Sequence, residues 1–168
     1  QTMNIVVTLA GLFIGESTGF TKGEELESMS DANVKCVMII DSEIPIGMVA
    51  NTSAILGITL GKHIPEQVGA DVVDASGQAH LGIITIPVTM LRGDKTILRE
   101  CRERLYGPEF SDLVVVDFSD VAQGCNVYSE YVAKAATVSE PDHTYLGIAM
   151  YGNKKKINKL TGFMPLLR

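Results

Sequence analysis

Residues 34–41 read Val-Lys-Cys-Val-Met-Ile-Ile-Asp. This continuous run of β-favouring apolar residues is typical of a strand that is buried on both faces, at the centre of a mainly parallel sheet. Pro45 and Gly47 then turn the chain, and residues 46–62 are apolar nearly all round, which predicts a buried helix. A central strand followed directly by a buried helix is the opening unit of an α/β domain.

Further strands and helices alternate along the rest of the chain. Residues 71–74 and 80–84 flank a glycine-containing turn and predict a hairpin. Other strands are predicted at 86–91, 112–118 and 144–151, with helices after Asp94, after residue 118 and after Asn153. The helix after residue 118 is expected to bury an apolar stripe of Val127, Tyr128, Tyr131, Val132 and Ala135. The prediction is a three-layer α/β sandwich around a mixed, mainly parallel sheet of four to five strands.

The composition fits one globular domain. Of 168 residues, 46% are hydrophobic and 20% charged, which favours a packed core over disorder. The net charge of −6 makes nucleic acid an improbable partner, because a phosphate backbone needs clustered basic residues. Three widely spaced cysteines without a C-x-x-C motif indicate free thiols in a reducing compartment, so we expect a cytoplasmic protein without a metal site or cofactor.

The first part of the sequence stands apart from this domain. Residues 1–33 are interpreted as an N-terminal extension, an apolar segment followed by a polar connection. The apolar segment lacks a basic start and is too short to cross a bilayer as a helix, so we expect no membrane partner. The folded domain is predicted to span residues 34–168.

Two stretches resemble the type-two peptidyl-tRNA hydrolases. The first is the strand, glycine turn and helix of residues 35–61, and the second is T-Y-L-G-I-A-M-Y-G-N-K-K-K-I-N-K-L-T-G-F-M-P-L-L at 144–167. The positions in the second stretch that fall on that family's pattern are Gly152, Ile157, Thr161 and Gly162.

Other details look closer to a bacterial family known as domain of unknown function 2000, which is placed in the peptidyl-tRNA hydrolase II-like superfamily. They are P-I-G-M-V-A-N at 45–51, D-A-S-G-Q-A-H-L-G at 74–82, and the Y-L-G-I-A-M-Y-G, L-T-G and L-L-R motifs of the final segment. The resemblance implies a mixed sheet sandwiched by helices and carries no agreed activity.

The catalytic pattern of the hydrolases is not retained. That pattern reads roughly G-K-x-A-A-Q-x-x-H-A, and here Gly47 and Ala50 match it. Met48, Thr52 and Ile55 stand where the lysine, glutamine and histidine are expected. Methionine cannot stabilise negative charge and isoleucine cannot transfer protons, so the activity should not be carried over.

A ligand site is predicted where the helix start, the hairpin and the turn before the last helix converge at one edge of the expected sheet. Its residues are Gly47, Asn51, Thr52, Asp74, His80, Tyr151 and Gly152. The helix start offers free N–H groups, and His80 with Asp74 could form an acid–base pair, which makes His80 the best catalytic candidate. Plainer interpretations stay open: a simple glycine turn, and a surface histidine hydrogen-bonded within a hairpin.

Three functional hypotheses follow. The leading one is a domain that binds a small anionic or carbonyl-bearing ligand. The second is a peptidyl-tRNA hydrolase, or a related hydrolase, with a divergent site; whether the chain is an enzyme stays open. The third is an interaction module, with a homodimer formed through the small residues Ala50, Ala54, Gly57 and Gly61 and the N-terminal segment.

Overall fold

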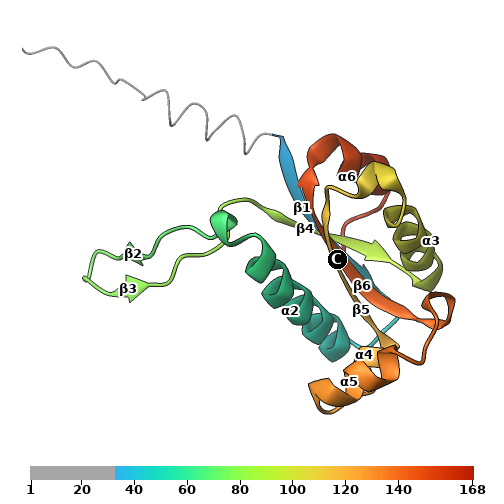
Figure 1. The fold of residues 1–168 in the computed structure, drawn as a ribbon. Coiled ribbons are helices and arrows are strands. Elements are labelled where there is room, and N and C mark those ends of the chain that lie inside the picture. The colour runs from blue at the N-terminus through green and yellow to red at the C-terminus, as the bar shows by residue number, and fades with distance from the viewer. Residues whose placement is uncertain (1–32) are drawn as a thin grey trace, which may run out of the picture.

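The computed structural model describes residues 33–168, and its strands form one central sheet (Figure 1). The predicted N-terminal extension, apart from Asn33, lies outside the described residues. The strands are β1 (Val34–Asp41), β4 (Val88–Gly93), β5 (Val114–Ser119) and β6 (Tyr145–Asn153). Their order across the sheet is β4-β1-β6-β5, so the predicted central position of residues 34–41 is confirmed.

The sheet is mixed, but the prediction that it is mainly parallel is wrong. Only the β1–β4 pair is parallel, while β6 lies antiparallel between β1 and β5. If β5 lay directly beside β1, the two strands would form a parallel pair. Instead β6 lies between them and forms an antiparallel pair with each. Because β1, β4 and β5 still run in the same direction, their carboxyl ends share one edge of the sheet, which we call the carboxyl edge.

Helices cover both faces of the sheet. The α2 helix (Ile46–His63) packs on one face, and α3 (Lys95–Leu105) and α6 (Lys154–Thr161) pack on the other (Figure 1). Two further helices, α4 (Asp120–Gln123) and α5 (Tyr128–Ala135), follow β5 at the carboxyl edge. Short 3₁₀ turns occur at Pro65–Gln67, Pro108–Phe110 and Glu140–Asp142.

The core consists of two apolar clusters, one on each side of the sheet. Alternate β1 side chains point to opposite faces. Val37 and Ile39 contact the α3–α6 layer, and Met38 and Ile40 contact the α2 layer. All four are at most 5% exposed, which explains why residues 36–40 of this strand are apolar without interruption.

The outer edge of β4 is covered by the end of the chain. Leu166 forms an antiparallel bridge with Leu91. The N–H of Arg92 donates to the carbonyl of Pro165, and the N–H of Leu167 donates to the carbonyl of Met90. The body of the protein therefore protects this strand edge from pairing with another chain.

The predicted hairpin is present, but it projects away from the sheet (Figure 1). Its strands are β2 (Val72–Val73) and β3 (Ala79–His80), which pair only with each other. The hairpin follows α2 and leads into β4.

The predicted buried stripe of α5 is wrong. No residue of α5 is buried, and the side chains of Val127, Tyr128 and Val132 are between 55% and 78% exposed. The helix lies beyond the sheet and contacts mainly α4, so its apolar side chains have little to pack against. Periodicity identified the apolar stripe but could not show whether another element covers it.

Candidate functional site

A cleft of about 370 Å³ opens on the α2 side of the sheet, near the carboxyl edge. Its walls come from Ile55 and Thr59 of α2, from residues 116–118 of β5, and from residues 122–131 around α4 and α5. We call it the α2–α5 cleft. In α/β sheets ligands characteristically bind near the carboxyl ends of strands.

The cleft arises because a single long helix cannot cover a four-stranded sheet. Within residues 33–168, α2 is the one long helix on this face, and Leu56 and Leu60 anchor it to the core. The edge strand β5 is left partly uncovered, so Val114 and Val116 are only half-buried. The segment from α4 to α5 closes the end of the resulting groove.

The cleft has apolar walls and a few polar groups. Ile55, Val116 and Phe118 provide apolar surface, and Thr59 and Tyr131 provide hydroxyl groups. This combination, a mostly apolar concavity with a small number of polar groups, is typical of small-molecule sites.

Electrostatics restricts what this cleft can accept. Asp117 is the one charged residue among those that line it, but its Oδ2 accepts a hydrogen bond at 2.7 Å from Nε of Arg102, which belongs to the α3 layer on the other face of the sheet. Burial, and secondarily the charge of Asp117, raises the pKa of Tyr131. A tyrosine hydroxyl is protonated at neutral pH and can donate a hydrogen bond. The Tyr131 ring meets that of Tyr128 edge-on, with centroids 5.7 Å apart.

Two of the residues predicted at the helix start lie at the carboxyl edge. Gly47 is in the first turn of α2, and Nδ2 of Asn51 donates to Oε1 of Gln123 at 3.4 Å, which links α2 to α4. Thr52, in contrast, is fully buried and lies against Gly147 of β6. Its side chain cannot reach a ligand at the surface.

Thr52 gives a test of this local packing. Its Oγ1 is buried and has no hydrogen-bond partner among the described residues, so Thr52→Val should leave the free energy of unfolding unchanged or raise it by up to about 1 kcal/mol. Thr161 is the matched control, because it is equally buried but its Oγ1 donates to the carbonyl of Ile157 at 2.8 Å. Thr161→Val should lower stability by about 1 kcal/mol in urea denaturation. Equal losses of stability for the two variants would contradict the conclusion that the Thr161 hydroxyl is hydrogen-bonded and the Thr52 hydroxyl is not.

Tyr151 and Gly152 lie at the end of the sheet that is opposite the carboxyl edge, beside the start of β1. The predicted convergence of the site residues is therefore wrong. Tyr151 pairs with Cys36, and Gly152 pairs with Lys35, at the start of β1. The helix start at Gly47 follows the other end of β1. The reason is that β6 runs antiparallel to β1, which places the end of one strand beside the beginning of the other.

The predicted contact between Asp74 and His80 is confirmed. Nε2 of His80 lies 3.3 Å from Oδ2 of Asp74, on the projecting hairpin and away from the carboxyl edge. The backbone N–H groups of Ser76 and Gln78 also donate to Asp74. The hydrogen bond from Gln78, followed by that from His80, lowers the pKa of Asp74. Both side chains are largely exposed, and the pair forms part of the turn.

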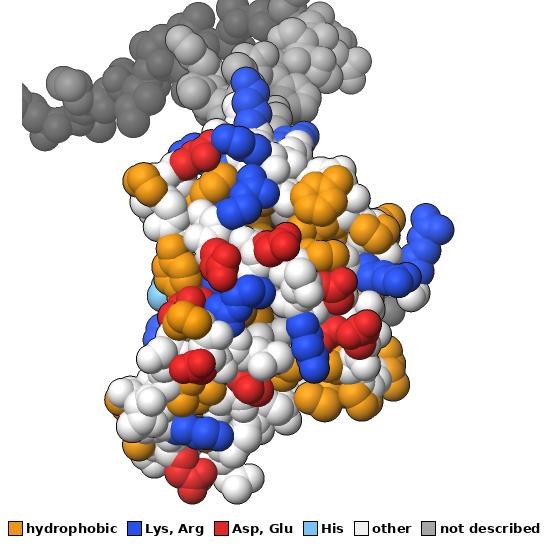
Figure 2. Space-filling view, turned by 90° about the vertical axis from the view of Figure 1, so that its right-hand side faces the viewer, with side chains coloured by type: hydrophobic (Ala, Val, Ile, Leu, Met, Phe, Trp, Pro, Cys, Tyr) orange, Lys and Arg blue, Asp and Glu red, His pale blue; other side chains and the backbone are white. Residues whose placement is uncertain are grey.

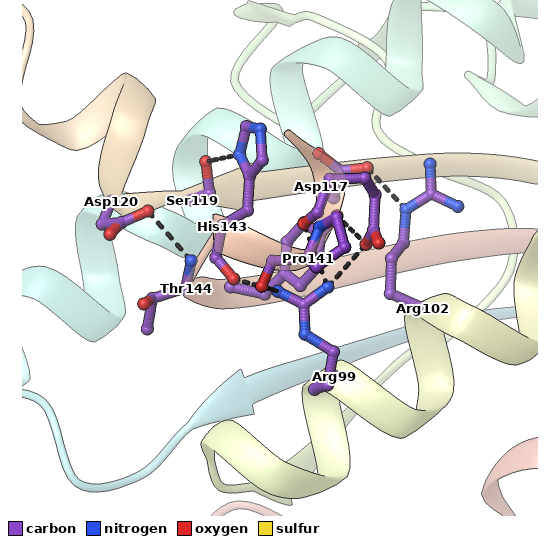
Figure 3. A network of polar contacts seen from close by, with 10 residues as sticks. Arg99, Arg102, Asp117, Ser119, Asp120, Pro141, His143 and Thr144 are labelled. Atoms are coloured by element: carbon purple, nitrogen blue, oxygen red, sulfur yellow. Dashed lines mark hydrogen bonds and ion pairs between the residues drawn. The ribbon is translucent and has the colours of Figure 1, made fainter. Parts of the chain in front are cut away.

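A contact between the hydroxyl of Ser119 and the imidazole of His143 was not predicted. Oγ of Ser119 lies 3.0 Å from Nδ1 of His143, where β5 ends and β6 is about to begin (Figure 3). No local motif marks this pair, because the two residues come together only through the pairing of β5 with β6. Within residues 33–168 no carboxylate contacts His143, so the pair lacks the third member of a nucleophile–base–acid arrangement.

Arg99 of α3 holds the loop that carries His143 (Figure 3). Its guanidinium donates to Oε1 of Glu140 at 2.6 Å and to the carbonyls of Glu140, Pro141 and His143. The hydroxyl of Tyr145 donates to the same Glu140 oxygen at 2.9 Å. Because the Arg99 guanidinium makes these hydrogen bonds to the loop, it is not free to bind an anionic ligand.

Charges are mixed over the face formed by α3 and α6 (Figure 2). Lysines of α6 pair with acidic residues near the short turn after α3: Lys156 with Asp112 and Lys159 with Glu109, each at 2.6 Å. Acidic and basic side chains therefore alternate on this face and do not form a patch of one sign.

Neither a membrane-spanning helix nor a cluster of metal ligands occurs within residues 33–168. No helix there has both the length and the apolar character needed to cross a bilayer. No group of three or more His, Cys, Asp or Glu side chains is arranged to hold a metal ion.

The fold and the cleft define a class of protein: an α/β/α domain with one mixed sheet and a ligand-sized cleft beside its first helix. Within that class the chain belongs to the family described as protein of unknown function DUF2000, whose family model matches residues 34–168. The resemblance seen in the sequence motifs is thus confirmed at the level of this family.

A solved structure shares the fold. It is that of the protein of unknown function Atu0240 from Agrobacterium tumefaciens strain C58, with a TM-score of 0.73 and 16% sequence identity. The match covers 81% of this chain and 98% of the other. No curated protein matches the chain significantly.

Proposed function

We propose that this domain binds a small, neutral, carbonyl-bearing molecule in the α2–α5 cleft. The observation that carries the proposal is the position of Tyr131, a hydroxyl-bearing side chain that lines a mostly apolar cleft whose volume of about 370 Å³ is that of a small-ligand site. A carbonyl oxygen could accept a hydrogen bond from Tyr131 while the rest of the ligand packs against Val116 and Phe118.

The charge of the cleft favours the carbonyl-bearing ligand over the anionic one. No Lys, Arg or His is among its lining residues, so no side chain there would offset the hydration that an anion loses on binding. Asp117 is itself paired with Arg102, so it does not require a cationic ligand either.

The wider kinship with the peptidyl-tRNA hydrolase II-like superfamily is part of this proposal. It is supported by the motifs at 35–61 and 144–167, and a mixed sheet between helical layers is compatible with it. Hydrolysis of peptidyl-tRNA is not included, because Met48, Thr52 and Ile55 replace the catalytic side chains and Thr52 is buried. The free cysteines Cys36, Cys101 and Cys125 support a location in the reducing cytoplasm.

Two isosteric probes test the ligand chemistry. Benzamide and benzoate have nearly the same shape, but only benzamide is neutral. We expect benzamide to shift the amide NMR signals of residues 116–131 and to bind about five- to tenfold more tightly than benzoate, because a mostly apolar cleft without a basic side chain does not compensate the benzoate charge for its lost hydration. Tighter binding of benzoate would overturn the proposed ligand class.

Two tryptophan variants of α2 test the location. Thr59→Trp fills the cleft and should abolish the benzamide shifts. Ile58→Trp is the matched control, since Ile58 is the adjacent residue, is 77% exposed and does not line the cleft. Benzamide binding that survives Thr59→Trp would place the site elsewhere.

A further inference from the structure

A second pocket, of about 180 Å³, lies on the other flank of α2. The α2–α5 cleft lies between α2 and β5, whereas this pocket lies between α2 and the strands β1 and β4. One helix over a four-stranded sheet leaves room on both of its sides, so both spaces have the same origin. We call the second one the β4-side pocket, and its floor is made by Cys36, Met38 and Val88.

The base of the projecting hairpin closes this pocket. The hairpin leaves the body at the end of α2 (Figure 1). At its base Val68 and Ile84 form an antiparallel bridge, and the N–H of Thr85 donates to the carbonyl of Gln67 at 2.9 Å. Gln67, Val68 and Ile84 all line the pocket. Backbone contacts therefore fix the wall that lies opposite the sheet.

Two glycines of α2, Gly57 and Gly61, leave the space of the pocket open. A Cβ on Gly61 would meet nothing within 4 Å, and a Cβ on Gly57 would meet only Cε of Met38, at an ordinary contact distance of 3.7 Å. Neither position therefore requires glycine for close packing. Glycine inside a helix is less stable than alanine, and both residues lie in the interior of the 18-residue α2. A need for room beside the helix accounts for them.

Gln67 brings one polar group to this otherwise apolar pocket. It is the one lining residue with a nitrogen or oxygen in its side chain, and it is only 9% exposed. Its Oε1 accepts a hydrogen bond from Oγ1 of Thr85 at 3.4 Å, whereas its Nε2 donates to no group within residues 33–168. Buried amides are normally hydrogen-bonded, so this Nε2 is available to donate to an acceptor in the pocket.

The size and lining of the pocket define what it can hold. An ordered water needs two to four polar partners, and the lining offers a single side-chain amide. Apolar cavities of about 150 Å³ stay dry and bind molecules of the size of benzene. The β4-side pocket, at about 180 Å³, therefore has room for a six-membered ring with one small substituent.

From these observations we propose that the β4-side pocket is a second ligand site, which takes a compact, uncharged ring molecule with one hydrogen-bond acceptor. The ring packs against Met38, Leu60 and Val88, and the acceptor receives a hydrogen bond from Nε2 of Gln67. A charged molecule is disfavoured, because no charged side chain lines the pocket to offset its lost hydration. The site does not depend on the α2–α5 cleft, since the two spaces lie on opposite flanks of α2.

Anisole and ethylbenzene, added to the full chain, test the ligand chemistry. The two molecules have nearly the same shape, but only anisole carries an acceptor oxygen. We expect anisole to shift the amide NMR signals of residues 36–38, 57–61 and 84–88, with a dissociation constant below about 1 mM. Gln67→Met should weaken anisole binding about three- to tenfold and leave ethylbenzene binding unchanged, because only anisole loses a hydrogen bond. Equal losses for the two probes, or no shifts with either, would overturn the proposal.

Gly61→Leu tests the location, because the leucine side chain would occupy the pocket and should abolish anisole binding. Lys62→Leu is the matched control, since it places the same side chain at the adjacent, exposed position of α2. It should leave anisole binding intact, as should Thr59→Trp, which fills the α2–α5 cleft. Anisole binding that survives Gly61→Leu, or that Thr59→Trp abolishes, would show that the site is elsewhere.

Gly61→Ala tests whether the glycine is needed for packing. The added methyl group meets nothing within 4 Å and replaces a glycine inside a helix. The midpoint of thermal unfolding should therefore rise by about 2–4 °C. A lower midpoint would show that Gly61 serves the fold, and the argument for an open pocket would fail.

Discussion

Replacing Ile148 with alanine should lower the free energy of unfolding by about 4 kcal/mol. Ile148 lies in β6, pairs with Ile39 of β1, and is completely inaccessible to solvent. It belongs to the cluster between the sheet and the α3–α6 layer. Because β6 is held on both sides by β1 and β5, the surrounding structure cannot collapse into the cavity that alanine leaves.

The same substitution at Ile58 provides the control. Ile58 is 77% exposed on α2, so Ile58→Ala should change the free energy of unfolding by no more than about 0.5 kcal/mol. Urea denaturation of both variants, with unchanged slopes, measures the two values. If Ile148→Ala lowers the free energy of unfolding by less than about 1.5 kcal/mol, Ile148 is not tightly packed in the core and the prediction is wrong.

Alkaline pH should destabilise the fold through two buried thiols. Cys36 lies in β1 on the α2 side of the sheet, and Cys101 lies in α3 on the other side. Burial raises the pKa of each thiol from 9.0 to about 11, because a thiolate cannot be solvated there. These thiols stabilise the fold fully below pH 9, and that contribution is lost as the pH rises from about 9 through about 11.

The expected loss is roughly 2–3 kcal/mol per thiol at the upper end of this range. Urea denaturation in the presence of a reductant, from about pH 8 to about pH 11, measures it. The double variant Cys36→Ala/Cys101→Ala starts from a lower stability, but its curve should fall less steeply above about pH 9. Parallel curves for the two proteins would show that the thiols ionise equally in the folded and unfolded states.

Much of the local structure could be predicted from the sequence, whereas the order of strands could not. Residues 34–41 were assigned correctly because layers on both faces require an uninterrupted apolar run. The same pattern says nothing about which strands are neighbours. The position of β6 between β1 and β5 depends on contacts between segments far apart in the chain. This position is the reason that the prediction of a mainly parallel sheet is wrong.

The candidate site shows the same division between local and distant contacts. Asp74 and His80 are close in the sequence, and their contact was predicted from a hairpin turn. Ser119 and His143 approach each other only because their strands pair, and no motif indicated it. Asn51 was identified at the helix start, but its neighbours in α4 and the cleft beside them depend on how β5 ends.

The central place of β6 also has consequences for how the chain acquires its structure. During synthesis β1 is made about a hundred residues before β6, the strand that must lie beside it. Pairing between segments so distant along the chain closes a long loop and slows folding. Until residues 145–153 leave the ribosome, β1 and β5 each keep an unpaired inner edge, and unpaired strand edges favour aggregation.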